Sequence, residues 1–113
     1  MKLKTSKLNN MWTLEFLEVA LEDLESLDFG LRKQVLKAIE KVLMNPISKE
    51  RGGYGTPLGN KSGINLTGLY KIKLLASGVR IVYGLHEKDK VMTIIVIGLR
   101  SGNSVYKDAY KRR

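Results

Sequence analysis

Residues 69–85, LYKIKLLASGVRIVYGL, decide the fold. Apolar and polar side chains alternate over residues 69–74, which predicts a strand with two different faces. Ser77-Gly78 supplies turn residues, and residues 79–85 are rich in the β-branched and aromatic side chains that favour a second strand. The stretch therefore predicts an antiparallel β-hairpin.

The segments after this hairpin extend the sheet. A charged turn at residues 87–90 leads into residues 91–99, which are apolar at almost every position. A run of that kind predicts a central strand that is covered by helices on one side. Residues 104–111 then predict a short closing helix with Ser104 as its N-cap.

Before the hairpin, the sequence predicts one strand and two helices. Residues 11–16 alternate as a short strand does. Residues 18–27 carry apolar residues at helical spacing, with Asp23 and neighbouring glutamates turned outward, and a second helix runs from an N-cap at Asp28 to about Met44. Because few residues separate the two helices, we expect an antiparallel helical hairpin.

Residues 46–63 are predicted to be a loop. The residue before a proline avoids the helical region, so Asn45-Pro46 ends the second helix. Five glycines and Pro57 follow within the segment, and a loop of this length is typically functional or mobile. The element order is then β-α-α-β-β-β-α, an α+β fold in which a helical hairpin packs on a curved antiparallel sheet.

The composition sets the class of protein. The chain has 113 residues, 43% of them hydrophobic, and no cysteine. This predicts a single domain over residues 11–113, after a basic leader at residues 1–10 that need not be ordered, and it excludes disulfides and thiolate chemistry. No apolar run reaches the roughly 18 residues of a membrane span, so we expect a cytoplasmic protein without a membrane partner.

The positive charge is unevenly distributed. The formal net charge is +9, and residues 61–113 hold 11 Lys and Arg against three Asp and Glu, whereas residues 11–50 are mildly acidic. Such asymmetry is typical of an oriented surface for a polyanion. General solubility charge explains the same composition, and the sequence does not separate the two interpretations.

The usual catalytic residues are scarce. The single histidine, His86, adjoins a charged turn and is interpreted as a solvated residue. The carboxylates of the first helix have no His or Cys nearby, so they are interpreted as a solvated face, and no metal site is expected. The glycines of residues 52–63 match neither the phosphate-loop nor the dinucleotide-binding pattern, and no cofactor is expected.

A set of cations on the strands remains. Lys71 and Lys73 are two residues apart, so their side chains leave the same face of a strand. Arg80 lies just across the turn from them, Arg100 follows the next strand, and Tyr106 lies in the first turn of the last helix. These five residues are the candidate catalytic residues, and we expect their side chains to converge on one concave side of the sheet.

Such a cluster suits cleavage of RNA by its own 2′-hydroxyl. That reaction needs a base for the hydroxyl, cations for the phosphorane and a proton for the leaving 5′-oxygen. Two neighbouring lysines lower each other's pKa, so one of them can be the base, and a guanidinium group fits phosphate oxygens. Cations on strands are also common as solvated faces or as protection of sheet edges, and this alternative stays open.

Two stretches of the chain resemble the RelE family of bacterial toxins. They are residues 69–85 and residues 96–112, VIGLRSGNSVYKDAYKR. The likeness consists of a Tyr-Lys-x-Lys-Leu strand, a Ser-Gly turn, an Arg-Ile-Val-Tyr strand, and a closing Arg followed by Val-Tyr-x-x-Ala-x-x-Arg. The helical hairpin that ends at Asn45-Pro46 is also similar, and the likeness covers about residues 11–113.

The resemblance implies a RelE-like fold and a toxin of a type II toxin-antitoxin system that cuts translated mRNA in the ribosome. Lys71 and Lys73 are then similar to the lysines that activate the 2′-hydroxyl, and Arg80 to the residue that stabilises the transition state. Arg100 is similar to the residue that protonates the leaving group, and Tyr106 to the one that orients or stacks on the substrate. The implied partners are a cognate antitoxin, the ribosome and mRNA, with no small-molecule cofactor.

Two other functions are compatible with the sequence. The ParE branch of the same fold poisons DNA gyrase and is not a nuclease, but that branch does not share this set of lysines, arginines and tyrosine. The second alternative is an RNA-binding module without catalysis. The chain also departs from the RelE pattern at the glycine-rich residues 52–63, at Leu75, where the family prototype is basic, and in its leader.

Overall fold

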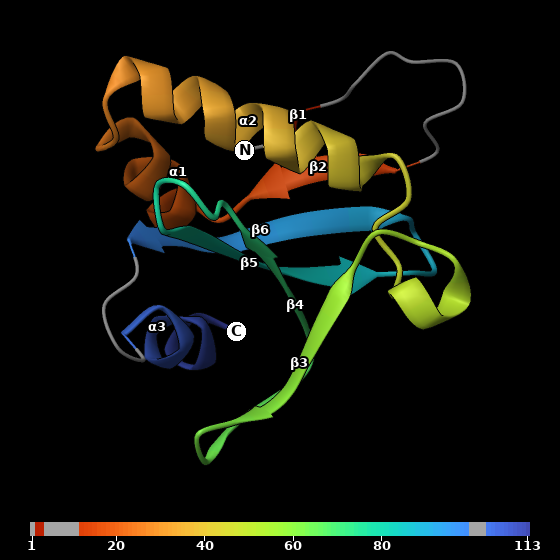
Figure 1. Cartoon of the computed structure of the whole chain (residues 1–113). Helices are drawn as coiled ribbons and strands as arrows, with labels where there is room; N and C mark the ends of the chain where they lie inside the picture. Colours follow the sequence, from red (N-terminus) through yellow and green to blue (C-terminus); the bar gives the residue numbers. More distant parts are fainter. Residues whose placement is uncertain (1, 4–11, 100–103) are drawn as a thin grey trace.

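The computed structural model describes residues 2–3, 12–99 and 104–113, which form one six-stranded sheet with helices on both faces (Figure 1). The strands are β1 (Lys2–Leu3), β2 (Thr13–Phe16), β3 (Thr56–Lys61), β4 (Ile64–Lys73), β5 (Val79–His86) and β6 (Val91–Leu99), in the sheet order β1-β2-β6-β5-β4-β3. The helices are α1 (Glu18–Glu25), α2 (Phe29–Leu43) and α3 (Ser104–Arg112), with a short 3-10 turn at Lys49–Arg51. The α+β class and the predicted element order are confirmed, with β1 and β3 as additional strands.

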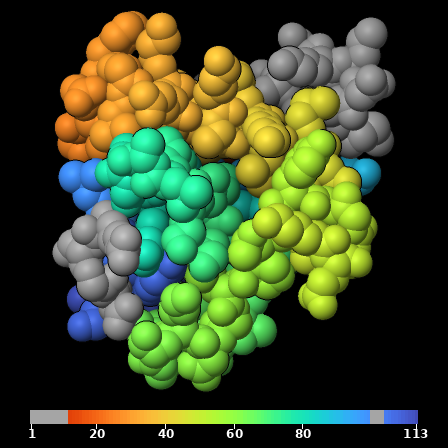
Figure 2. Space-filling view, in the orientation of Figure 1, coloured from red at the N-terminus to blue at the C-terminus, as the bar shows by residue number. Residues whose placement is uncertain are grey.

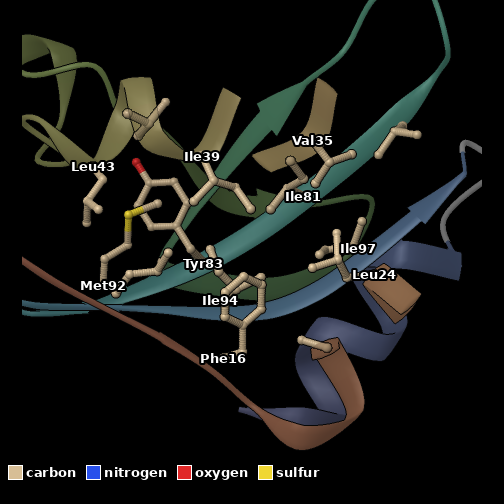
Figure 3. Packing of buried hydrophobic residues seen from close by; sticks show 14 residues of the cluster. Phe16, Leu24, Val35, Ile39, Leu43, Ile81, Tyr83, Met92, Ile94 and Ile97 are labelled. Carbon is tan, nitrogen blue, oxygen red and sulfur yellow. The ribbon is translucent and has the colours of Figure 1, made fainter. Parts of the chain in front are cut away.

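The helical hairpin covers one face of the sheet. Asp28 begins α2 as predicted, because its Oδ1 accepts a hydrogen bond from the Leu31 amide at 2.9 Å and so satisfies a free N–H group of the first turn. α2 ends at Leu43, just before Asn45-Pro46. The larger core of the molecule lies between these helices and the strands, and it includes Leu24, Val35, Ile39, Leu43, Ile81, Tyr83, Met92 and Ile94 (Figure 3).

The third helix, α3, covers the opposite face. A second, smaller core lies beneath it and consists of Leu66, Leu69, Val82, Ile95, Val96, Val105, Tyr106 and Ala109. A Cβ atom on Gly98 would lie 2.9 Å from Val105 Cγ2, so this glycine allows α3 to approach β6 closely. The prediction that helices cover β6 on one side only was wrong: both of its faces are apolar because both are covered.

The segment predicted as a loop, residues 46–63, is largely structured. Backbone hydrogen bonds, such as that from Tyr54 N–H to Asn45 O at 2.8 Å, fold its first part into a compact turn. β3 then pairs antiparallel with β4, which begins at Ile64 rather than at residue 69. Pro57 and a following glycine disfavour strands, but β3 lies at the edge of the sheet, where a proline is tolerated.

The N-terminal strands give the sheet its mixed character. β2 pairs with β6 in parallel, whereas the other pairings are antiparallel, so the sheet is not wholly antiparallel as predicted. Lys2 and Leu3, which belong to the predicted leader, pair with β2 as β1. Residues 4–11, which include the first residue of the predicted strand, lie outside the described residues.

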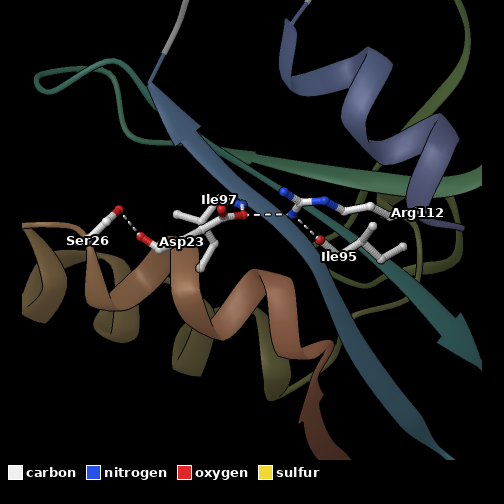
Figure 4. A network of polar contacts seen from close by, with 5 residues as sticks. All are labelled: Asp23, Ser26, Ile95, Ile97 and Arg112. Atoms are coloured by element: carbon white, nitrogen blue, oxygen red, sulfur yellow. Dashed lines mark hydrogen bonds and ion pairs between the residues drawn. The ribbon is translucent and has the colours of Figure 1, made fainter.

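Asp23 does not point into solvent, contrary to the prediction. Its Oδ2 accepts hydrogen bonds from the Ile97 amide at 3.1 Å and from Arg112 Nη1 at 2.7 Å, and this nitrogen also donates to Ile95 O at 2.9 Å (Figure 4). Ile95 is the extra residue where the β5–β6 register shifts, and Ile97 lies beyond Ile94, the last β6 residue that pairs with β2. The two charged side chains therefore satisfy backbone groups that no strand reaches, and they tie α3 to α1 and β6.

Candidate functional site

The pairing of β4 with β5 places three of the predicted cations on one face of the sheet. Lys73 lies opposite Arg80, and Lys71 lies opposite Val82. Val82 belongs to the core under α3, whereas Ile72, between the two lysines, packs against the core under α1 and α2. Because side chains alternate along a strand, Lys71, Lys73 and Arg80 leave the sheet on the α3 side.

Tyr106 connects Arg80 to α3. The tyrosine is 1% exposed in the first turn of the helix, and its hydroxyl accepts a hydrogen bond from Arg80 Nη1 at 3.3 Å. The guanidinium carbon lies 5.4 Å from the ring centroid, within the range of a cation–π interaction. The ring is therefore buried, and its hydroxyl holds the guanidinium of Arg80; a contact of Tyr106 with substrate stays a prediction.

A further cation, Lys61, reaches the same ring and was not singled out from the sequence. Its Nζ lies 5.7 Å from the ring centroid of Tyr106. Lys61 is the last residue of β3, and it was missed because β3 falls in the segment that was predicted as a loop. The signal that could have located it is Ser62-Gly63, a pair of turn-forming residues directly after the lysine.

The cations around Tyr106 act on one another. Burial lowers the pKa of the Lys71 ammonium below its ordinary value, and the charges of Lys61, Lys73 and Arg80 lower it further. In the part of the chain that the structure describes, the ion pairs with carboxylates lie elsewhere, so no Asp or Glu neutralises these four cations. An external anion could therefore bind to this cluster without displacing a carboxylate of the described residues.

A hollow of about 560 Å³ lies between β4 and the C-terminal half of α2, so it opens on the helical-hairpin side of β4, whereas the Lys71 and Lys73 side chains leave on the α3 side. No acidic residue lines it, and its polar walls include a tyrosine that is 49% exposed and four lysines: Tyr54, Lys41, Lys49, Lys71 and Lys73. A groove that combines cations with an exposed aromatic ring suits a single strand of nucleic acid.

The remaining expectations concern other residues. Arg100, the fifth candidate catalytic residue, lies outside the described residues. His86 is exposed, as predicted, but it is the last residue of β5 and not a loop residue. Across residues 2–3, 12–99 and 104–113, no three His, Cys, Asp or Glu side chains gather as potential metal ligands. None of the helices described is both long enough and apolar enough to cross a membrane.

The arrangement can bind a phosphate and remove a proton beside it. A lysine with a lowered pKa is a better base near neutral pH than an ordinary lysine is. A guanidinium that is held by a buried phenol presents its N–H groups to a phosphoryl oxygen without first having to be ordered.

Comparisons with known proteins point to one family, although no protein-family model matches the chain. The chain is 33% identical over 99 residues to the mRNA interferase toxin RelE of Escherichia coli, and the match covers 88% of this chain and 94% of the relative. A mutant of the Escherichia coli toxin RelE in the free state has a TM-score of 0.69 at 32% identity, over 88% of this chain and 94% of that chain. A structure of such a mutant in complex with an antitoxin RelBc peptide has a TM-score of 0.66 at 30% identity, over 91% and 98% of the two chains. Similar in sequence and in structure over most of its length, this chain belongs to the RelE family of toxins.

Proposed function

We propose that this protein is the toxin of a type II toxin-antitoxin system, an mRNA interferase that cuts mRNA on the ribosome and so inhibits translation. It would be a metal-independent endoribonuclease. The observation that carries the proposal is the cluster in which Lys71, Lys73 and Arg80 share the α3 face of the sheet and Arg80 is bound to Tyr106. The Escherichia coli relative is named an mRNA interferase toxin.

Lys71 is the proposed base. Its lowered pKa leaves a larger neutral fraction near neutral pH than an ordinary lysine has. The neutral amine takes the proton of a ribose 2′-hydroxyl, and the 2′-oxygen then forms a bond to the adjacent phosphorus. The bond from phosphorus to the 5′-oxygen breaks, which leaves a 2′,3′-cyclic phosphate on one product and a 5′-hydroxyl on the other.

The other candidate residues act on the developing charge. Arg80 donates hydrogen bonds to the phosphoryl oxygens, and Tyr106 keeps its guanidinium in place. Lys73 is exposed opposite Arg80 and adds a second cation on the same side of the phosphate. Arg100, in the role that the resemblance implies, supplies the proton that the leaving 5′-oxygen requires.

The ribosome and a cognate antitoxin are the proposed partners. The basic C-terminal half and the lysine-lined hollow are suited to ribosomal RNA and an extended mRNA strand, and this association should weaken as the salt concentration rises. The related toxin has been solved with an antitoxin peptide, and the charge here fits a partner with a complementary acidic surface. Because its substrate is mRNA under translation, the toxin acts in the cytoplasm.

Primer extension in a reconstituted translation reaction tests the proposal. The wild-type protein should cut a translated message at codons in the ribosomal A site, and the same message without ribosomes should stay largely intact. Arg80→Ala is the matched inactive variant. An intact message in the presence of wild-type protein would contradict the proposal, and gyrase-dependent DNA breaks in its place would support the ParE alternative.

A further inference from the structure

Lys61 is brought to the candidate site by a hairpin with a defined turn. It is the last residue of β3 and pairs with Ile64, the first residue of β4. The two residues between them, Ser62 and Gly63, have positive φ angles of 52° and 80°. Positive φ at both central positions is typical of the tight hairpin turn whose twist matches that of the strands. This tight turn therefore restricts the position of Lys61 more than a long loop would.

The hairpin is also packed against α3 and the C-terminus. Arg113 Nη2 donates a hydrogen bond to Thr67 O at 2.7 Å, and Leu58 and Ile64 pack against the core under α3. In the space-filling view, the tip of the β3–β4 hairpin lies at the bottom and the β4–β5 turn lies near the top. Part of α3, in blue, is visible between them (Figure 2). These contacts pack the hairpin against the α3 side of the molecule.

Two cations consequently share one aromatic ring. Lys61 Nζ lies 5.7 Å and Arg80 Cζ lies 5.4 Å from the ring centroid of Tyr106. After burial, the charge of Lys61 is the largest cause of the lowered pKa of Lys71. Charges of one sign that are held this close repel one another, and no carboxylate among the described residues pairs with them. An anion would relieve that repulsion, and the fold holds the cations ready for it.

We propose that Lys61 is a substrate-binding residue of this site, whose ammonium group binds a phosphate of the RNA beside Arg80. The inference rests on the proposed function and extends the site from β4, β5 and α3 to the β3–β4 hairpin. Lys61 also favours the neutral form of Lys71, because a nearby positive charge disfavours protonation. One residue thus serves both phosphate binding and the readiness of the base.

The test measures single-turnover cleavage of a defined mRNA in the A site of purified ribosomes, as a function of the concentration of full-length toxin. Lys61→Gln removes the charge and Lys61→Arg keeps a cation. Lys88→Gln is the matched control, because it removes one charge from the exposed turn at the far end of β5. Lys61→Gln should lower the maximal rate about tenfold, less than the loss of a fully enclosed donor. The maximal rate of Lys61→Arg should stay within about threefold of that of the wild type. The maximal rate of Lys88→Gln should equal that of the wild type.

Two further readouts separate a contact with RNA from a structural role. In a plot of the logarithm of the cleavage efficiency against the logarithm of the salt concentration, removing one phosphate contact should make the slope shallower by about 0.7 to 0.9. Removing the charge should raise the pKa of Lys71, so the rise of the maximal rate with pH should move to higher pH. Lys61→Met, which keeps the side-chain stem over the ring, replaces Lys61→Gln if the latter lowers thermal stability.

The inference is overturned if the neutral variants retain the wild-type maximal rate and pH profile. It is equally overturned if they change only the toxin concentration at half saturation and leave the salt dependence unchanged, because such a loss of affinity would not come from a phosphate contact. Absence of cleavage by the wild-type protein would reject the proposed function itself, and this inference with it. Cleavage by the wild type with unaffected Lys61 variants would reject the inference alone.

Discussion

Each face of the sheet buries a tyrosine, and the two tyrosines differ in the hydrogen bond that the hydroxyl makes. Under α1 and α2, the hydroxyl of Tyr83 donates to Pro46 O at 2.9 Å, and its ring stacks on Tyr70 with 5.2 Å between centroids. Burial raises the pKa of Tyr83, so this hydroxyl stays protonated as a donor. Under α3, the hydroxyl of Tyr106 instead accepts a hydrogen bond from Arg80. One phenol is bound to the backbone and the other to a cation.

This difference indicates that one face of the sheet contributes mainly to stability and the other to the proposed chemistry. The face under the helical hairpin holds the larger apolar core, and the candidate catalytic side chains leave the sheet on the opposite face. Substitutions on the first face should therefore change the free energy of unfolding and leave the cleavage rate of the folded protein unchanged. Substitutions of the cations next to Tyr106 should change the cleavage rate and leave the free energy of unfolding nearly unchanged.

The largest effect is expected in the core under α2. Ile39 is fully buried, so Ile39→Ala should lower the free energy of unfolding by about 2–5 kcal/mol, because it removes apolar contacts and leaves a cavity. Chemical denaturation of the purified protein measures this loss, and the cleavage rate per folded molecule should not change. Leu75→Ala, at a residue that is 87% exposed, is the control. A lower cleavage rate per folded molecule of Ile39→Ala would show that the face under α2 also contributes to the chemistry, and would contradict this division between the faces.

Loss of the guanidinium on the other face should abolish most activity. Arg80→Ala is expected to lower the cleavage rate about 100-fold or more, the scale of removing one preorganised charge donor, with a thermal transition close to that of the wild type. Arg51→Ala removes a guanidinium of the surface ion pair with Glu87, whose atoms lie 2.9 Å apart, and it should retain full activity. Equal cleavage rates for Arg80→Ala and the wild type would show that Arg80 does not stabilise the transition state.

The two tyrosines offer a matched pair of smaller changes. Tyr83→Phe leaves the Pro46 carbonyl without its buried donor and should cost about 1–3 kcal/mol of stability at an unchanged rate. Tyr106→Phe releases Arg80 and should lower the rate by about fivefold, the kinetic equivalent of one ordinary hydrogen bond. Denaturation and cleavage assays on both variants would show whether the effects are divided in this way. A reversed pattern would refute the division.

The smallest expected effect is a displaced pH profile. The proposed base, Lys71, would act in its neutral form, so the rate should rise with pH and level off below the ordinary pKa of a lysine. Lys73→Gln removes one of the charges that lower the pKa of Lys71, so the rise should move to higher pH, whatever the change in maximal rate. Lys33→Gln, on α2, is the control. Identical profiles for Lys73→Gln and the wild type would argue against Lys71 as the base.

The elements with clear periodicity were predictable from sequence. Alternation over residues 69–74 and the Ser77-Gly78 turn predicted the β4–β5 hairpin. The same alternation put Lys71 and Lys73 on one face, because neighbouring side chains on a strand point to opposite faces, and the turn brought Arg80 near them. Asp28 and Asn45-Pro46 marked the ends of α2 through backbone chemistry that acts locally.

Features that depend on distant parts of the chain were not predictable. β3 was not predicted because it contains Pro57 and Gly59, which edge strands tolerate but local patterns exclude, and Lys61 was missed with it. The parallel pairing of β2 with β6 joins segments from opposite ends of the chain, and no local pattern records it. The burial of Tyr106 likewise follows from the way α3 packs on the second face of the sheet.

The contacts of Asp23 and Arg112 with β6 have a consequence for solubility. Beyond Ile94, the pairing of β6 with β2 stops, and unpaired backbone groups at such a place can recruit a foreign strand. The carboxylate and guanidinium occupy the amide of Ile97 and the carbonyl of Ile95. Asp23 of α1 and Arg112 of α3 thus cover backbone groups that would otherwise be free for an incoming strand, so we expect Arg112→Ala to increase the tendency of the protein to aggregate.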